Sequence, residues 1–232
     1  MSKRAAEDVC DPRAPKRMAL SLGPDLITIK VGTQQQSYCI HSQLLCADSQ
    51  FFRSATKKEW KEGQNREIAL PEDTTEVFDI YIQWLYQKKI LCQIDDSNPV
   101  DKEVSDQYRL LIDVFIFGDK VQDIPLKDAT INALCNLSDL RNEKNLCIDP
   151  TGVNVTRAYR GTMPGSPLRK FFATLYSWFT LPSWSTKECP VELKDAVLVA
   201  LLSRRVATPP WWQWQPCSMH EHIESYICPV ED

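Results

Sequence analysis

The residue types that could support chemistry in this sequence are cysteine and histidine. Cys39 and His41 are two residues apart on a segment that alternates like a β-strand, so their side chains would share one face. A Cys–His pair catalyses only when the two groups meet in space. We expect this face to point into the domain interior, where a free thiol is usually inert. The sequence also contains no glycine-rich phosphate loop, nucleophile elbow or metalloprotease helix motif, so we expect no catalysis and no cofactor.

A second set of candidate ligands lies near the C-terminus. Zinc prefers a mixed cysteine and histidine ligand set of this kind. The four residues are Cys217, His220, His222 and Cys228. Their spacing matches no common zinc finger, and they lie in a stretch without periodicity. We therefore interpret them as an accidental cluster and as weak metal candidates.

The amino-acid composition excludes several classes of protein. The chain has 232 residues, of which 43% are hydrophobic and 25% charged, as in ordinary globular proteins. A net charge of −4 without a concentrated basic face argues against direct binding to nucleic acid. Nine cysteines, an odd number, and no recognisable secretory signal favour reduced thiols in the nucleus or cytoplasm. The apolar run Ala196–Leu202 is far shorter than the roughly 20 residues that span a bilayer, so we expect no membrane span.

The N-terminal stretch, residues 1–23, is rich in proline and charge and poor in large apolar side chains, which predicts a disordered arm. Two basic pairs in it are spaced like a bipartite nuclear-import signal. These candidate residues are Lys3, Arg4, Lys16 and Arg17. A solvated basic tail is the simpler interpretation of the same residues.

Alternation then predicts a hairpin. In residues 26–31, Ile27, Ile29 and Val31 share one face, and residues 36–40 form the returning strand. Two short helical pieces, a polar loop over 57–65 and a short strand over 66–70 follow. Trp60 in the polar loop either folds back onto the domain or awaits a partner.

Helical periodicity dominates from residue 74 onward. Asp73 or Thr74 is expected to cap a helix whose apolar stripe packs in the core. The stripe consists of Val77, Ile80, Tyr81, Trp84 and Leu85. An edge strand is expected over 88–91, a strongly apolar helix over 103–118 that Gly118 can end, and a helix over 125–137.

Three further helices are expected over 151–159, 167–180 and from Pro190 onward. In the last of them the expected buried residues are Leu193, Val197, Ala200 and Leu201. Residues 207–232 lose periodicity and form a tail. Its three indoles, Trp211, Trp212 and Trp214, either dock on the preceding helices, which we favour, or anchor a partner.

This order of elements, with its residues, resembles the BTB/POZ domain. The matching pieces are Asp25–Gly32, Ile40-His41 with Leu44-Leu45, Ser49–Arg53, Ile68–Pro71, Val77–Tyr86, the helix over 104–120 and Ile124–Lys127. The resemblance covers residues 24–137 and implies an α+β fold, a small sheet flanked by short helices. Residues 138–206 form a helical extension. There, Gly165–Lys170 and the aromatic helix with Trp178 resemble the C-terminal extension of short BTB proteins of filamentous fungi.

The resemblance implies a non-enzymatic protein-interaction module that forms homodimers or binds a cullin scaffold of a ubiquitin ligase. Cullin-binding members carry a hydrophobic residue, any residue and then an acidic residue before the third strand, and Trp60-Lys61-Glu62 fits. A self-contained loop with a solvated Glu62 is an equal alternative. Dimeric members pair the acid at Asp25 with a base after the histidine, but that position holds Ser42. The alternative function is a nuclear regulatory scaffold that acts without a ubiquitin ligase.

Overall fold

The computed structural model describes residues 22–92, 99–141, 148, 150–179 and 189–203. In these residues one sheet has the strand order β2-β1-β3, with β1 and β2 antiparallel and β1 and β3 parallel. The strands are β1 (Leu26–Val31), β2 (Gln36–His41) and β3 (Glu67–Leu70). Ile27, Ile29 and Val31 are buried, which confirms the hairpin and its inward face.

Short helices link the hairpin to β3. They are α1 (Ser42–Asp48), α2 (Gln50–Ala55) and α3 (Lys61–Asn65). The prediction of a polar loop over 57–65 is wrong for residues 61–65, because these form α3. This helix ends where Arg66 adopts a left-handed conformation with φ of 54°. The helix α3 was not predicted because it is short and polar, so its sequence shows no apolar periodicity.

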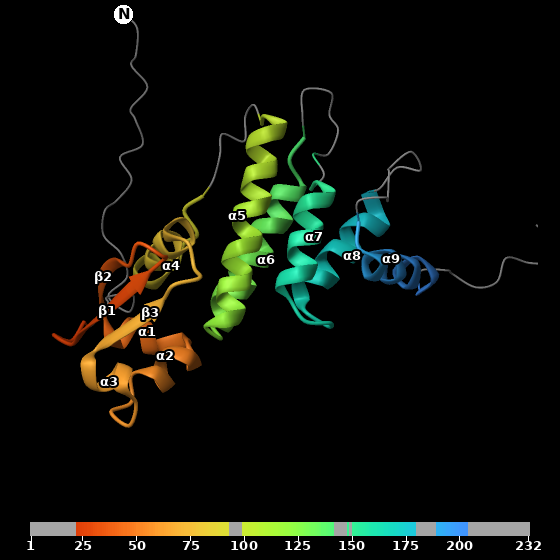
Figure 1. Ribbon diagram of the computed structural model, residues 1–232. Coiled ribbons are helices and arrows are strands. Elements are labelled where there is room, and N and C mark those ends of the chain that lie inside the picture. The colour runs from red at the N-terminus through yellow and green to blue at the C-terminus, as the bar shows by residue number, and fades with distance from the viewer. Residues whose placement is uncertain (1–21, 93–98, 142–147, 149, 180–188, 204–232) are drawn as a thin grey trace, which may run out of the picture.

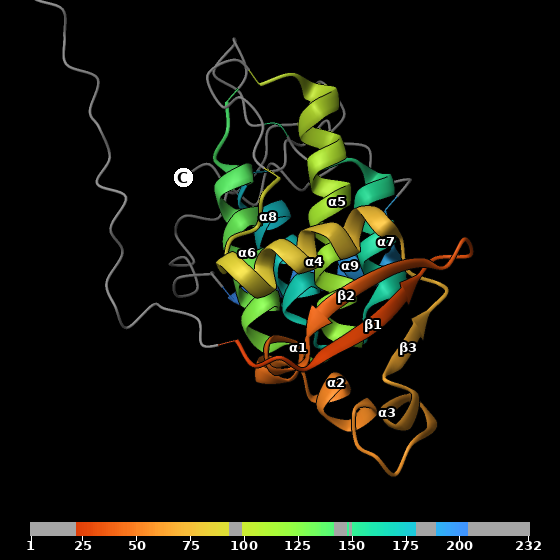
Figure 2. The same cartoon turned by 90° about the vertical axis from the view of Figure 1, so that its left-hand side faces the viewer.

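Helix α4 (Thr75–Gln87) lies beside the sheet (Figure 2), and its predicted stripe is buried in one hydrophobic cluster with the inward side chains of the strands. Thr74 caps it, since its side chain accepts a hydrogen bond from the Val77 amide. Phe78 joins the stripe and lies within 6.0 Å of the Tyr81 and Phe117 ring centroids. The residues after α4, Lys88–Leu91, form no strand with the described part of the chain, so the predicted edge strand is wrong.

Two long helices, α5 (Asp101–Lys120) and α6 (Ile124–Ser138), form the centre of the molecule (Figure 1). Gly118 does not end α5 but is buried inside it. A Cβ at Gly118 would lie 3.1 Å from the Lys127 side chain and 3.3 Å from that of Leu126, so the glycine permits close packing of α6. The helix instead ends at Lys120.

The remaining helices lie on the far side of α5 and α6 from the sheet (Figure 1). They are α7 (Gly152–Gly161), α8 (Pro167–Phe179) and α9 (Val191–Ser203). In α9 only Leu193 of the four expected core residues is buried. Val197 and Ala200 are only half-buried, and Leu201 is exposed. The prediction that these three residues are buried is therefore wrong.

Two hydrophobic clusters share α5. Val114 and Phe117 belong to the cluster formed with the sheet and α4, while Tyr108 and Phe115 belong to the cluster formed with α7 and α8. The predicted boundary after residue 137 stays a prediction. Among the described residues, no helix is both long enough and apolar enough to cross a bilayer.

Candidate protein-binding site

The α2–α3 connection presents an exposed indole on a fixed backbone. Trp60 is 59% exposed. Its amide donates to the Lys57 carbonyl at 3.0 Å, and its own carbonyl accepts from the Gln64 amide at 3.0 Å. The Gln64 side-chain amide donates to the Lys58 carbonyl, also at 3.0 Å. These bonds fix the backbone of the loop, and the indole that it carries is largely exposed.

Gly63 makes this loop compact. A Cβ at this position would lie 2.1 Å from the Lys57 carbonyl oxygen and 2.8 Å from that of Thr56. Backbone atoms cannot retreat from such a contact as the end of a flexible side chain can. A glycine at residue 63 is therefore required for α3 to approach the end of α2, and sequence analysis missed this role.

Glu62 lies in the first turn of α3, where the helix dipole favours an acidic side chain. It is exposed and forms no ion pair with the residues that the structure describes. Glu62 lines a shallow cavity of about 250 Å³, together with Asp25, Ser42 and Arg66. The sequence-predicted residues Glu62 and Asp25 are thus brought to one surface.

Asp25 has a cation beside it, but not from the expected position. The Ser42 amide donates to the Asp25 carbonyl at 2.9 Å, so the two residues are adjacent, and Ser42 supplies no charge. Arg66 takes this place instead, with its guanidinium 3.7 Å from the Asp25 carboxylate. Both side chains are largely exposed, so this pair is weak. Arg66 reaches Asp25 because β3 lies parallel to β1, a contact that no local pattern signals.

Cys39 and His41 differ in their surroundings. Cys39 is opposite Thr28 in the hairpin register, on the face away from Ile27 and Ile29. The thiol is exposed, so the expectation of an interior position is wrong. His41 has a structural partner, because its Nδ1 lies 2.7 Å from the Tyr86 hydroxyl.

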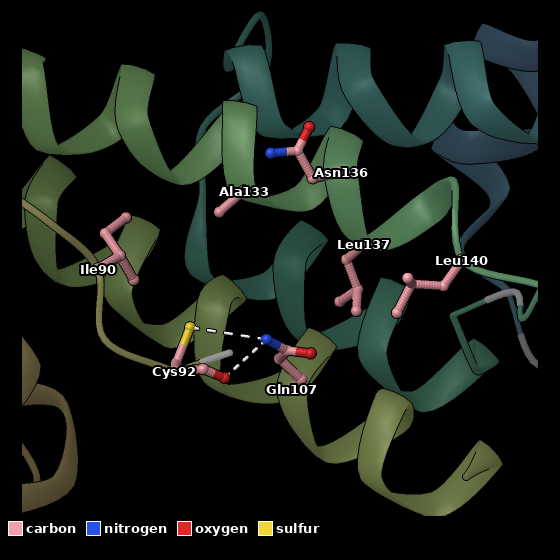
Figure 3. A pocket seen from close by; sticks show the side chains of 7 residues that line it. All are labelled: Ile90, Cys92, Gln107, Ala133, Asn136, Leu137 and Leu140. Atoms are coloured by element: carbon pink, nitrogen blue, oxygen red, sulfur yellow. Dashed lines mark hydrogen bonds between the residues drawn. The ribbon is translucent and has the colours of Figure 1, made fainter. Parts of the chain in front are cut away.

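A cavity of about 360 Å³ lies between the segment after α4 and helices α5 and α6 (Figure 3). Gln107 lines it, and its side-chain amide donates to the Cys92 carbonyl at 2.7 Å. Burial raises the pKa of the Cys92 thiol, so the thiol stays protonated at neutral pH and is a poor nucleophile. This cavity offers no nucleophilic chemistry.

The other candidate residues cannot be placed. The described residues contain no group of His, Cys, Asp and Glu side chains that could hold a metal ion. The following candidates lie outside the described residues: Lys3, Arg4, Lys16, Arg17, Trp211, Trp212, Trp214, Cys217, His220, His222 and Cys228.

Comparison with known proteins agrees with the fold. Residues 25–113 match the model of the BTB/POZ domain family. The kelch repeat and BTB domain-containing protein 4 of Mus musculus is 30% identical over 94 residues, which are 40% of this chain and 17% of that protein. The protein of the same name from Homo sapiens is 29% identical over 94 residues, again 40% and 17% of the two chains. The matched part of this chain therefore spans less than a fifth of these relatives.

Proposed function

Residues 25–113 form a BTB/POZ domain, a fold that generally serves protein–protein interaction, and from this premise we propose that the protein is a non-enzymatic adaptor. Its partner contact is the α2–α3 loop with Trp60 and Glu62, and the partner is the cullin scaffold of a ubiquitin ligase. The observation that carries the proposal is the exposed indole of Trp60 on a hydrogen-bonded loop.

An exposed tryptophan on a fixed loop suits a binding hot spot. Tryptophan contributes a large contact area and is enriched among residues whose truncation costs at least about 2 kcal/mol of binding free energy. The loop is already ordered by Gly63 and Gln64, so binding costs little conformational entropy. A complementary partner offers an apolar pocket for the indole.

Glu62 adds a charge requirement to the same surface. It has no cation among the described residues, whereas Asp25 has Arg66. The partner therefore supplies a lysine or arginine opposite Glu62. A charge contact of this kind at the rim of an interface changes association rate and salt dependence more than affinity.

The test measures binding of purified cullin N-terminal region by calorimetry to the full chain and three variants. Trp60→Ala is expected to raise Kd by about 30-fold or more. Glu62→Gln is expected to raise it by roughly 3- to 10-fold, with the larger effect at low salt. Glu59→Gln is the matched control, since it removes the same charge from the same exposed loop.

Glu59→Gln should bind within about twofold of the wild-type protein, because rim charges outside the contact contribute little. If all three variants bind the cullin with the affinity of the wild-type protein, the assignment of Trp60 and Glu62 to the contact is wrong. Absence of binding by the wild-type chain would remove the cullin as partner and leave only the adaptor class.

A nuclear regulatory scaffold without a ubiquitin ligase is the second candidate function. It is supported by the spacing of the basic pairs Lys3-Arg4 and Lys16-Arg17. Imaging of a tagged chain with all four residues changed to serine tests it. Loss of nuclear signal is expected, and an unchanged distribution would remove its support.

Self-association is a separate proposal, which the fold class supports. The largely exposed Asp25–Arg66 pair would lie beside such an interface. Mass photometry across a concentration series measures it directly. A single monomer peak at micromolar protein would rule it out under those conditions.

A further inference from the structure

Helix α9 carries an apolar surface that the described residues leave open. We define the outer α9 surface by four side chains: Leu198, Val199, Leu201 and Leu202. Leu198 is 55% exposed, Val199 62% and Leu202 46%. The opposite side of the helix is occupied, since Leu193 is buried and Val197 packs against the cluster of α7 and α8.

An apolar helix surface of this kind is normally covered by another segment or molecule. A helix that is apolar on all sides is normally buried, whereas a surface helix alternates apolar and polar faces. The segment Ala196–Leu202 contains no polar residue, so no rotation of α9 could turn a polar face to water. Contiguous apolar patches on folded proteins usually mark binding sites.

The chain that follows α9 is in position to be this occupant. Residues 204–232 begin at the end of α9 that carries Leu201 and Leu202. An extended stretch over 204–211 reaches roughly 26 Å, and α9, with 13 residues, is about 20 Å long. The indoles of Trp211, Trp212 and Trp214 can therefore reach any turn of the helix.

The chemistry of this segment suits an apolar helix. Between Ser203 and His220 the chain has no acidic residue, so its three indoles can be buried without desolvating a carboxylate. Arg204 and Arg205 directly follow α9 in the sequence, and the dipole of a helix favours positive charge at its C-terminal end. Tryptophan also buries much area for little lost side-chain freedom.

Tethering favours this segment over a second copy of the chain. A short linker holds the indoles near α9 at an effective concentration in the millimolar range. A second copy would have to compete from bulk solution. We propose that residues 207–216 fold back across the outer α9 surface of the same chain and bury Trp211, Trp212 and Trp214 against it.

Amide hydrogen exchange of the full chain tests the proposal from the side of the tail. In a Trp211→Ser/Trp212→Ser/Trp214→Ser variant, the amides of residues 196–203 are expected to exchange at least tenfold faster than in the wild-type protein. Trp60→Ser is the control, because it removes an exposed indole just before α3, which lies at the opposite end of the molecule from α9 (Figure 1). Equal exchange of α9 in the triple variant and the wild type would overturn the proposal.

Substitutions on the outer α9 surface give a second, independent test of the proposal. Leu198→Gln/Leu202→Gln changes only exposed side chains, so the packing of α9 on α8 is preserved. Acrylamide quenching of tryptophan fluorescence is expected to increase, since three of the seven tryptophans lose their cover. Met163→Gln, an exposed apolar residue between α7 and α8, is the matched control.

Unchanged quenching in the α9 variant would overturn the proposal. So would protection of α9 that fades on dilution of the wild-type chain, because that result assigns the surface to a second copy. Protection that is independent of concentration and lost in the triple tryptophan variant supports the intramolecular contact.

Discussion

Helices α4 and α9 each contain 13 residues, but they differ in how many of their side chains are buried. In α4 six side chains are buried, and they recur at helical spacing along one stripe. In α9 only Leu193 is buried, although the helix is richer in aliphatic residues. Apolar content alone therefore does not decide how much of a helix is buried.

The difference in burial comes from the spacing of polar residues along each helix. The polar residues of α4 are spaced so that its apolar stripe faces the sheet while the rest meets water. The run Ala196–Leu202 has no polar position to orient it, and α8 can cover only one side. A surplus of apolar surface on such a helix indicates a further contact, and the two helices should respond differently to the same kind of mutation.

The largest difference is expected between Phe78→Ala in α4 and Leu198→Ala in α9. Phe78 is fully buried, with the Tyr38 ring centroid 5.0 Å away. Its truncation should reduce the free energy of unfolding by about 3–5 kcal/mol. Leu198→Ala should cost less than about 1 kcal/mol, because much of the side chain stays in contact with water or with a weakly held cover. Urea unfolding measures both, and equal losses would contradict the comparison.

A smaller effect is expected at the joint between α7 and α8. The Arg169 guanidinium donates to the Tyr159 carbonyl at 2.6 Å and also to the Thr162 carbonyl, and it lies 4.8 Å from the Tyr159 ring centroid. Arg169→Met should cost about 2 kcal/mol, since hydrogen bonds from a charged donor to half-buried carbonyls are among the stronger ones. Lys170→Met, at an exposed neighbouring position, should change stability by less than about 0.5 kcal/mol. A loss of the same size in both variants would show that Arg169 acts only through its charge.

Local signals predicted the parts of the fold that local sequence determines. Alternation in residues 26–31 predicted β1 and its inward face, and Thr74 with the stripe after it predicted the start and the buried side of α4. The start of α8 at Pro167 agrees with the predicted helix over 167–180, since proline suits the first turn of a helix. In each case the capping group or the periodicity lies within a few residues of the element that it specifies.

Contacts between distant segments were not predictable in this way. The outward position of Cys39 depends on the register with Thr28, and the pairing of Asp25 with Arg66 depends on β3 lying beside β1. Helix α3 depends on the close approach of Gly63 to Lys57. Trp60 and Glu62 were identified from the sequence, but their exposure on an ordered loop was not.

A buried carboxyl group, that of Asp123, lies at the start of α6. Asp123 is fully buried and caps α6, since its Oδ1 accepts from the Leu126 amide at 2.9 Å. Its Oδ2 has no hydrogen bond of standard geometry. Burial is the main reason that the Asp123 pKa is raised, and the Asp48 carboxylate adds to it, while the Leu126 amide, Lys88 and Trp84 act in the opposite direction. The folded protein therefore holds a proton on this carboxyl to higher pH than the unfolded chain does.

The smallest expected effect is a change in pH dependence at Asp123. Because the folded-state pKa is raised, the stabilising contribution of Asp123 is complete below the unfolded pKa of about 4 and is lost as pH rises through the folded pKa. Asp123→Asn keeps an oxygen for the Leu126 amide but cannot ionise. Urea unfolding at pH 4 and pH 7 should show that the wild-type chain loses more stability than the variant over this range. Asp128→Asn, on the same helix, is the control and should follow the wild type; if Asp123→Asn also follows it, the carboxyl is not a buried titrating group.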